Sequence, residues 1–391
     1  MKMALMPEKT DPDEFIIRNG RGAMEEVLNN AESLVDRFIS SHLSEAGTSI
    51  DSKLKVLKPI LEVLKYLDGV ELDVRVKNIA LRLGGIEERD VYKRQMLDVP
   101  DSEFNPYGVE YYGNVNFLKT GIIYSQAVTT VSKKYAEEIL TPEFGFGLEY
   151  VLNARKEKLQ GIINGVDYDI WDPMNDKEIP SQYTVDDLTG KAACKKALQK
   201  SFGLKEDAKA PLIGIVSRLA DQKGFDLIAG VIEKFLKEGV QFAILGTGQK
   251  NLEEYFGALP EKFPKIAGVK IGFDNKIAHL IEAGSDMFLM PSKYEPCGLN
   301  QIYSLRYGTV PVVRGTGGLE DTIIDSTADT KNGTGFKFYD YSEGALVDAL
   351  NRALDGFKSK KDWSKIQKRA MEADYSWSAS ARKYLELFET I

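Results

Sequence analysis

Two short loops between Pro291 and Asp321 carry the residue types best suited to chemistry. In the first loop, Glu295 separates the apolar run Met287 to Met290 from a helical pattern that opens at Gly298. A carboxylate between a buried strand and a helix can accept hydrogen bonds from two hydroxyl groups of a hexose or a ribose. An acidic residue there can also simply interact with the dipole of the helix that follows. Glu295 alone does not decide between these interpretations.

The second loop consists of Thr316, Gly317 and Gly318, which follow the apolar run Val310 to Val313 and precede an acidic helix start. Two glycines before a helix let backbone N–H groups approach a diphosphate closely. Each glycine by itself could instead serve a tight turn with a positive φ angle. Because both loops would emerge at the carboxyl edge of a sheet, they predict a shared ligand site there.

Positive charge is expected at the same edge of the sheet. Arg218 follows the strand-like run Leu212 to Val216, and Lys223 lies at the start of the next helical pattern. Two cations in this position could neutralise a nucleoside diphosphate as it departs and its negative charge grows. Each cation alone is commonly a surface charge, so the prediction depends on their meeting Glu295 in space.

The elements that must position these residues form an alternating pattern from about Leu212 onward. Short apolar runs typical of buried strands alternate with helical patterns, which predicts an α/β fold. The expected strands are Leu212 to Val216, Phe242 to Leu245, Val269 to Ile271, Met287 to Met290, Val310 to Val313 and, more weakly, Gly335 to Phe338. Gly246-Thr247-Gly248 follows the second strand and is a weak phosphate-loop signal by itself.

Three passages in order closely resemble bacterial glycogen synthase and its plant relative, starch synthase. They read VSRLADQKGFDLI, AILGTG and PSKYEPCGLNQIYSLRYGTVPVVRGTGGLEDT. The resemblance implies a GT-B type fold with two facing Rossmann-like domains. It also implies a hexosyltransferase that moves glucose from ADP-glucose to the non-reducing end of an α-1,4-glucan and retains the anomeric configuration. ADP-glucose would be the donor substrate, with no metal and no cofactor, because two cations can neutralise the charge that a divalent ion neutralises elsewhere.

The resemblance also implies roles for individual residues. Arg218 and Lys223 would stabilise the diphosphate, and Glu295 would position the glucose. The further substrate-binding residues implied by the match are Asn164, Gly246, Gly248, Tyr294, Cys297, Gly298, Leu299, Thr316, Gly317 and Gly318. We expect Cys297 to line the pocket rather than to act as a nucleophile, because no histidine in this motif could serve as its base.

The synthase resemblance begins at about Met96 and divides the rest of the chain into three parts. We expect a remnant of the acceptor-side domain over residues 96–163, a complete nucleotide-sugar-binding domain over 164–372 and a crossing helix over 373–391, whose apolar face would lack a full partner. The family's Lys-Thr-Gly-Gly-Leu loop and its active-site histidine have no matching motif, since Lys119-Thr120-Gly121 is followed by Ile122. We therefore expect a truncated acceptor-side domain and slow glucan elongation.

Residues 1–95 have a different, mainly helical character. Apolar residues at helical spacing predict three helices, the first over Met24 to Phe38, and the acidic run Asp11 to Glu14 predicts a turn and a capped helix start. The passage MPEKTDPDEFIIRNGRGAMEEVLNNAESLVDRFI resembles the end of the metal-binding catalytic domain of bacterial DNA primase, whose acidic metal ligands lie mostly further upstream. Because the polar run Asp90 to Gln95 belongs to neither family, we hypothesise that the chain is chimeric.

Composition and charge exclude several other classes of protein. The 391 residues are 43% hydrophobic and 28% charged, as in a globular protein of two or more domains, and the net charge of -8 argues against nucleic acid as a partner. Only two cysteines and two histidines are present, which favours a reducing, cytoplasmic compartment and excludes a His-rich metal site. No apolar run approaches the roughly 20 residues of a membrane span. The oligomeric state stays open.

Two other functions remain open at this point. A module that binds ADP or ADP-glucose without transferring glucose would fit the missing acceptor-side motifs. A nucleic-acid-interacting module derived from the primase-like helices is the second alternative, although the acidic balance argues against it.

Overall fold

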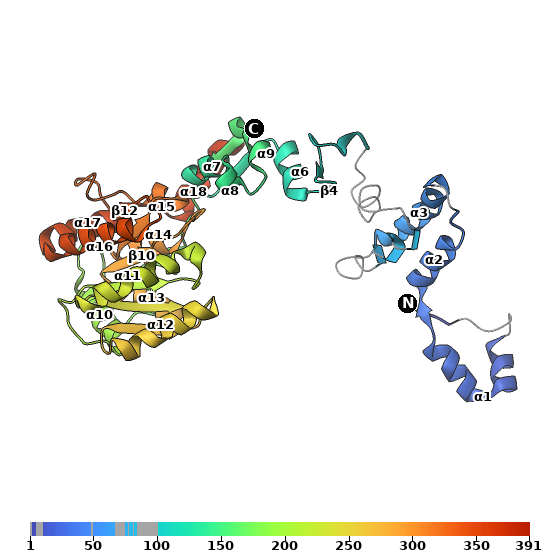
Figure 1. Cartoon of the computed structure of the whole chain (residues 1–391), viewed down its shortest axis with the longest axis horizontal. Coiled ribbons are helices and arrows are strands. Elements are labelled where there is room, and N and C mark those ends of the chain that lie inside the picture. The colour runs from blue at the N-terminus through green and yellow to red at the C-terminus, as the bar shows by residue number, and fades with distance from the viewer. Residues whose placement is uncertain are drawn as a thin grey trace. The chain divides into compact units, whose positions relative to one another are not determined.

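The computed structural model describes residues 2–4, 11–47, 50–66, 75–76, 78–80, 82–83 and 101–391. The chain divides into two compact units, Met1–Tyr124 and Ser125–Ile391 (Figure 1). The expected boundary at residues 95 and 96, with the run Asp90 to Gln95, lies outside the described residues. The expected boundaries at residues 163 and 372 fall within the second unit. All candidate site residues belong to that unit, so its architecture decides how they meet.

The second unit is built on a six-stranded sheet with the order β12-β11-β10-β7-β8-β9, in which all neighbouring strands are parallel. The strands are β7 (Leu212–Val216), β8 (Gln241–Gly246), β9 (Ala267–Ile271), β10 (Met287–Met290), β11 (Val310–Arg314) and β12 (Phe336–Phe338). All six expected strands are confirmed, with ends within two residues of the prediction. The agreement is close because a strand buried on both faces has a continuous apolar sequence.

Helices cover both faces of this sheet. They are α10 (Thr189–Ser201), α11 (Phe225–Lys237), α12 (Lys250–Lys262), α13 (Asn275–Gly284), α14 (Asn300–Arg306), α15 (Gly317–Thr322), α16 (Glu343–Lys358) and α17 (Lys360–Glu372), with a 3-10 turn η4 (Asp221–Lys223). Ile213 and Ile215 of β7 pack in one core cluster with residues of α11 and α16, whereas Leu212 packs in another with residues of α10 and α13. Because successive strand residues point to opposite faces, these two cores fix the register of each strand and the place where each loop emerges.

Two helix starts differ from the sequence prediction. Gly298 does not open α14, because its φ angle of 68° is left-handed, and the helix begins at Asn300. Gly317 and Gly318 do not precede α15 but are its first two residues, and Thr316 is the N-cap. Both corrections concern glycines at which the chain turns sharply, and these turns bring the two candidate loops together.

A smaller part of the second unit joins residues 125–166 to the C-terminal helix. Its elements are β5 (Val128–Thr130), α7 (Lys133–Glu138), α8 (Pro142–Gly145), α9 (Glu149–Ala154), η3 (Lys156–Lys158), β6 (Leu159–Gly161) and α18 (Trp377–Phe388). Strands β5 and β6 are parallel, and the Ser380 hydroxyl of α18 donates a hydrogen bond of 2.7 Å to the Ile163 carbonyl. A final helix is present, but it covers Trp377–Phe388 rather than the expected 373–391, and its side chains Trp377, Leu385 and Phe388 are more than half exposed.

The first unit contains helices that enclose one apolar cluster. Its elements among the described residues are β1 (Lys2–Met3), α1 (Pro12–Asn29), β2 (Glu32–Ser33), α2 (Leu34–Leu43), α3 (Ile50–Leu64), η2 (Asp101–Glu103), β3 (Glu110–Tyr111), β4 (Asn114–Val115) and α6 (Phe117–Tyr124). The single helix expected over Met24 to Phe38 is wrong, because β2 pairs with β1 and separates α1 from α2. Asp11 caps α1, as predicted. Lys119 lies inside α6, so Lys119-Thr120-Gly121 is helical and not a loop.

Candidate functional site

The strand order reverses between β7 and β10, which are neighbours in the middle of the sheet. The loops after such a pair of strands diverge and leave a crevice at the carboxyl edge. Arg218 and Lys223 follow β7, and Glu295 follows β10. A cavity of about 250 Å³ lies here, and these three side chains line it together with Leu299. We call it the carboxyl-edge cavity, and it brings together the three residues to which the sequence assigned catalytic roles.

Glu295 is the buried acid of this cavity, with 7% of its surface exposed. Its Oε2 atom lies 2.7 Å from the Lys223 ammonium and accepts a hydrogen bond of 2.9 Å from the Ser292 hydroxyl. The Oε1 atom accepts no hydrogen bond from the described residues. The sequence did not predict that Lys223 pairs with Glu295, because the two residues are far apart in the chain. This pair compensates the charge of a buried carboxylate, which would otherwise be costly.

Arg218 is exposed, and its guanidinium donates a hydrogen bond of 3.2 Å to the Gln222 side chain. Gln222 in turn joins the two loops. Its side-chain amide donates a hydrogen bond of 2.7 Å to the Tyr294 backbone carbonyl, and its backbone carbonyl accepts one of 2.9 Å from the Lys293 N–H. Sequence reasoning missed Gln222 and Ser292. Their positions directly beside Lys223 and within the Glu295 loop were the available signal.

Gly317 and Gly318 serve close packing of one loop against the other. A β-carbon on Gly317 would lie 2.0 Å from the Glu295 carbonyl oxygen, and one on Gly318 would lie 1.9 Å from the Cys297 carbonyl oxygen. The Gly318 N–H donates a hydrogen bond of 3.0 Å to the Glu295 carbonyl. The expectation that this N–H faces a phosphate therefore does not fit the arrangement, in which the N–H fixes the backbone of Glu295 instead.

Glu138 of α7 occupies the start of α15. Its Oε1 atom accepts hydrogen bonds of 3.0 Å from both the Thr316 hydroxyl and the Gly317 N–H. The second N–H expected to contact a phosphate thus also has a protein partner in this structure. Glu138 carries no sequence signal of its own, because the contact joins residues that are more than a hundred positions apart.

The Gly246-Thr247-Gly248 turn lies directly beside the loop that carries Arg218. A β-carbon on Gly246 would lie 2.0 Å from the Ser217 carbonyl oxygen, and Gly248 forms a bridge with Leu219. The Gly248 N–H donates a hydrogen bond of 2.7 Å to the Glu253 carboxylate. These glycines therefore allow two loops to approach each other, and the Gly248 N–H is not directed at a ligand as a phosphate loop would require.

Of the remaining predicted residues, only Leu299 lines the cavity. Cys297 packs with Ile163 and Val166, and its thiol interacts with the backbone of Asn164. Burial raises the pKa of the Cys297 thiol, although the Asn164 contact opposes this, so the thiol stays protonated and is a poor nucleophile. The Tyr294 ring contacts those of Phe144 and Phe146, with centroids 6.5 Å and 6.1 Å away.

His279 lies apart from the carboxyl-edge cavity. It is buried, its Nδ1 atom lies 2.8 Å from the Asp176 carboxylate, and its ring stacks on Trp171 with centroids 3.8 Å apart. These contacts make it a packed core residue. Over the residues that the structure describes, no group of three or more His, Cys, Asp or Glu side chains is arranged to hold a metal ion. None of the described helices is both long enough and apolar enough to cross a membrane.

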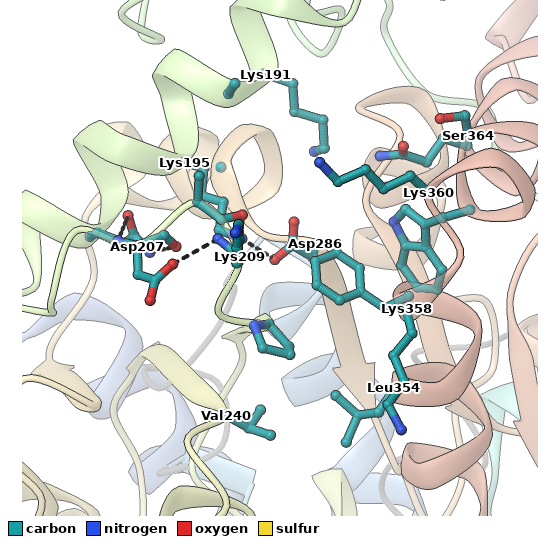
Figure 2. Close-up of a pocket in the computed structure, with 18 of the residues that line it drawn as sticks. Lys191, Lys195, Asp207, Lys209, Val240, Asp286, Leu354, Lys358, Lys360 and Ser364 are labelled. Carbon is teal, nitrogen blue, oxygen red and sulfur yellow. Dashed lines mark hydrogen bonds and ion pairs between the residues drawn. The ribbon is translucent and has the colours of Figure 1, made fainter.

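A second, larger cavity of about 1240 Å³ lies at the opposite edge of the sheet, beside Pro211, Val240 and Asp286, which precede β7, β8 and β10. We call it the amino-edge cavity. Figure 2 shows that several lysines surround it, among them Lys191 and Lys195. The sequence did not predict this cavity, because its lining residues come from many separate segments without a common motif.

The two buried lysines of the amino-edge cavity have protein partners. The Lys195 ammonium lies 2.6 Å from the Asp286 carboxylate (Figure 2). It also donates to the Ala208 and Ala210 backbone carbonyls. The Lys191 ammonium donates to the Thr309 hydroxyl at 2.6 Å and to two carbonyls at 3.0 Å. Burial lowers the pKa of Lys191 to about 8, although nearby carboxyl groups oppose the shift. These donors hold segments of the fold together.

The fold and the cavity at the switch point define a class of protein. Residues 197–370 match the family model "Glycosyl transferases group 1", and residues 78–154 match the model "Starch synthase catalytic domain". A glycosyltransferase structure from Rickettsia africae, 18% identical, has a TM-score of 0.51 and covers 88% of this chain and 82% of that chain, which is a likeness of fold alone. The chain has the GT-B type fold of glycosyltransferases.

Relatives with higher identity narrow this class. The chain is 49% identical over 294 residues to the glycogen synthase of Koribacter versatilis, covering 75% of this chain and 60% of the relative. It is 46% identical over 316 residues to that of Paracidovorax citrulli, covering 81% and 61%. The catalytic domain of Starch Synthase IV from Arabidopsis thaliana, bound to ADP and acarbose, is 35% identical with a TM-score of 0.71, covering 80% of this chain and 63% of that chain. These similarities support the glycogen synthase and starch synthase family.

The similarity covers only part of each relative. The chain spans about three fifths of the length of the curated relatives it matches. The match to the starch synthase model begins at residue 78, upstream of Met96, where the sequence motifs placed the start of the resemblance. None of these findings addresses the primase resemblance of residues 1–90, so the chimeric origin of the chain remains a hypothesis.

Proposed function

We propose that the protein is a retaining glucosyltransferase that transfers glucose from ADP-glucose to the non-reducing end of an α-1,4-glucan. The observation that carries this proposal is the carboxyl-edge cavity, where Arg218, Lys223 and Glu295 meet at the switch point of the sheet. The glycogen synthases and the ADP-bound starch synthase among its relatives support this choice of donor and acceptor.

The transfer breaks the bond between the anomeric carbon of glucose and the diphosphate oxygen, and it forms a bond from that carbon to the acceptor's 4-hydroxyl oxygen. The acceptor proton leaves with the departing ADP. Negative charge grows on the diphosphate as its bond breaks, so fixed cations nearby lower the barrier. Arg218 can turn toward the diphosphate because it is exposed and its hydrogen bond to Gln222 is long. Lys223 borders the same cavity.

Glu295 is suited to hold the glucose. The Lys223 ammonium and the Ser292 hydroxyl orient its Oε2 atom, which leaves Oε1 to accept hydrogen bonds from sugar hydroxyls. Lys223 therefore has two roles, since it orients the carboxylate and faces the leaving group. This sharing couples sugar recognition to diphosphate binding through one ammonium group.

Transfer of labelled glucose from ADP-glucose to glycogen tests the proposal. We expect incorporation with the unchanged chain and a loss of at least a hundredfold in Glu295→Gln, which keeps the shape of the side chain but removes its charge. UDP-glucose serves as the comparison donor. Equal rates for the unchanged chain and Glu295→Gln would contradict the assignment of Glu295.

A second candidate function is a module that binds ADP-glucose without transferring glucose. The observation that favours it is that the Lys-Thr-Gly-Gly-Leu loop and the active-site histidine of the acceptor side have no matching motif in this sequence. Tight donor binding together with no incorporation into glycogen would select this alternative.

A further inference from the structure

Each of the helices α7 and α15 provides a carboxylate that accepts hydrogen bonds from the first turn of the other helix. Glu138, at the last residue of α7, accepts hydrogen bonds of 3.0 Å from the Thr316 hydroxyl and the Gly317 N–H at the start of α15. Asp321, near the end of α15, accepts from the Lys134 N–H at the start of α7 at 3.0 Å. Two contacts at opposite ends fix the position of one helix along the other.

This contact continues to the backbone of Glu295. Gly317 is followed by Gly318, whose N–H donates to the Glu295 carbonyl at 3.0 Å. Gly317 itself lies so close that a β-carbon there would be 2.0 Å from the same carbonyl oxygen. A shift of the Thr316–Gly317 turn therefore moves the main chain of Glu295, and the carboxylate that lines the carboxyl-edge cavity moves with it.

The Glu138 carboxylate is placed at an energetic cost. One oxygen accepts two hydrogen bonds, but Oε2 is buried and has no partner. A buried acceptor without a donor is unfavourable. The nearby Lys134 ammonium does not relieve this, because it pairs with the exposed Glu137 at 3.0 Å. The contact at the Thr316–Gly317 turn must outweigh the loss of water around Glu138.

We propose that Glu138 is a positioning residue, which holds the Thr316–Gly317 turn and through it sets the place of Glu295 for glucose recognition. This inference rests on the proposed function, since it takes Glu295 as the group that binds the sugar. Arg218 and Lys223 follow a different strand, so Glu138 acts on their contact with a diphosphate only indirectly, through the pairing of Lys223 with Glu295. The sugar should therefore respond more strongly than the nucleotide when Glu138 is changed.

Calorimetric titration of the full chain with ADP and, separately, with ADP-glucose tests this role. In Glu138→Ala we expect ADP affinity within about twofold of the unchanged chain and ADP-glucose affinity lowered at least fivefold. Glu138→Gln should restore most of the loss, because its amide oxygen can accept the same two hydrogen bonds. Glu137→Ala is the matched control and should leave both affinities unchanged. Thr316→Val removes one of the two donors with little change in shape and should lower ADP-glucose affinity by a smaller factor.

Three results would overturn the inference. Equal ADP-glucose affinity in the unchanged chain, Glu138→Ala and Thr316→Val would show that the contact does not position Glu295. Tighter ADP binding in Glu138→Ala would show that this carboxylate competes with a phosphate. If the unchanged chain bound neither ligand, the proposed function itself would be wrong, and the inference would fail with it.

Discussion

The two edges of the six-stranded sheet use their charged residues in opposite ways. At the amino edge, Lys191 and Lys195 are buried and donate to backbone oxygens and to Asp286. At the carboxyl edge, Arg218 is exposed, and one oxygen of Glu295 accepts nothing from the described residues. The amino-edge cavity is the larger, at about 1240 Å³ against about 250 Å³. Groups that remain available for a ligand therefore indicate function here better than the size of a cavity does.

The largest expected effect is the loss of stability when the amino edge loses Lys195. Only 9% of this side chain and 14% of the Asp286 side chain are exposed. We expect Lys195→Met to lower the free energy of unfolding by about 3–5 kcal/mol, because it leaves the buried Asp286 carboxylate without its ion-pair partner. Chemical denaturation measures the effect. Lys196→Met is the control, since that side chain is mostly exposed and should change stability by less than about 0.5 kcal/mol. If Lys195→Met lost as little stability as Lys196→Met, the buried lysines of the amino edge would not be needed for stability, and the contrast between the two edges would fail.

At the carboxyl edge, we expect changes in binding, and a change in stability only for Lys223→Ala, which leaves the buried Glu295 carboxylate without its ion-pair partner. Arg218→Ala and Lys223→Ala should each weaken ADP binding about tenfold or more, since each removes a charge-assisted contact worth about 1.5–3 kcal/mol. Titration calorimetry gives the affinities, and thermal unfolding shows whether each variant folds. Lys209→Ala, an exposed lysine of the amino-edge cavity, should bind ADP as the unchanged chain does. If all three variants bound ADP equally well, the diphosphate assignment would have to be abandoned.

A smaller effect concerns how the stability of the fold depends on pH. Burial raises the pKa of Glu282 to about 8 from 4.5, and this shift is opposed by the Ser304 hydroxyl and by the charge of Lys191. Between about pH 4.5 and pH 8 the unfolded chain releases a proton that the folded chain keeps, so stability falls as pH rises through this window. Glu282→Gln keeps an acceptor for Ser304 and should reduce this loss by roughly 1 kcal/mol or more. Chemical denaturation of the unchanged chain and of Glu282→Gln at pH 5 and at pH 8 measures this reduction. If Glu282 were charged in the folded protein, the two proteins would lose the same stability between the two pH values.

The positions of the strands could be predicted from the sequence, because burial on both faces leaves continuous apolar runs such as Leu212–Val216 and Met287–Met290. The meeting of Arg218, Lys223 and Glu295 followed from the rule that loops after parallel strands share one edge. The sequence also places these three residues in motifs of recognisable spacing. Their convergence is therefore the part of the site that sequence reasoning could reach.

The hydrogen-bond partners within the site could not be predicted. The N–H groups of Gly317 and Gly248 were expected to face a phosphate, but Glu138 and Glu253 accept from them. Whether a loop N–H faces a ligand or a side chain depends on tertiary contacts that local sequence does not encode. The same reason explains why the pairing of Lys223 with Glu295 was missed, as the two lie in separate loops.

A crystal structure of the chain with ADP-glucose would test the central assignment most directly. We expect the ligand in the carboxyl-edge cavity, with its diphosphate about 3 Å from the Lys223 ammonium and the Arg218 guanidinium. A glucose hydroxyl should donate to Oε1 of Glu295 at a similar distance. Density for the ligand in the amino-edge cavity, beside Lys191 and Lys195, with the carboxyl edge empty would contradict the assignment.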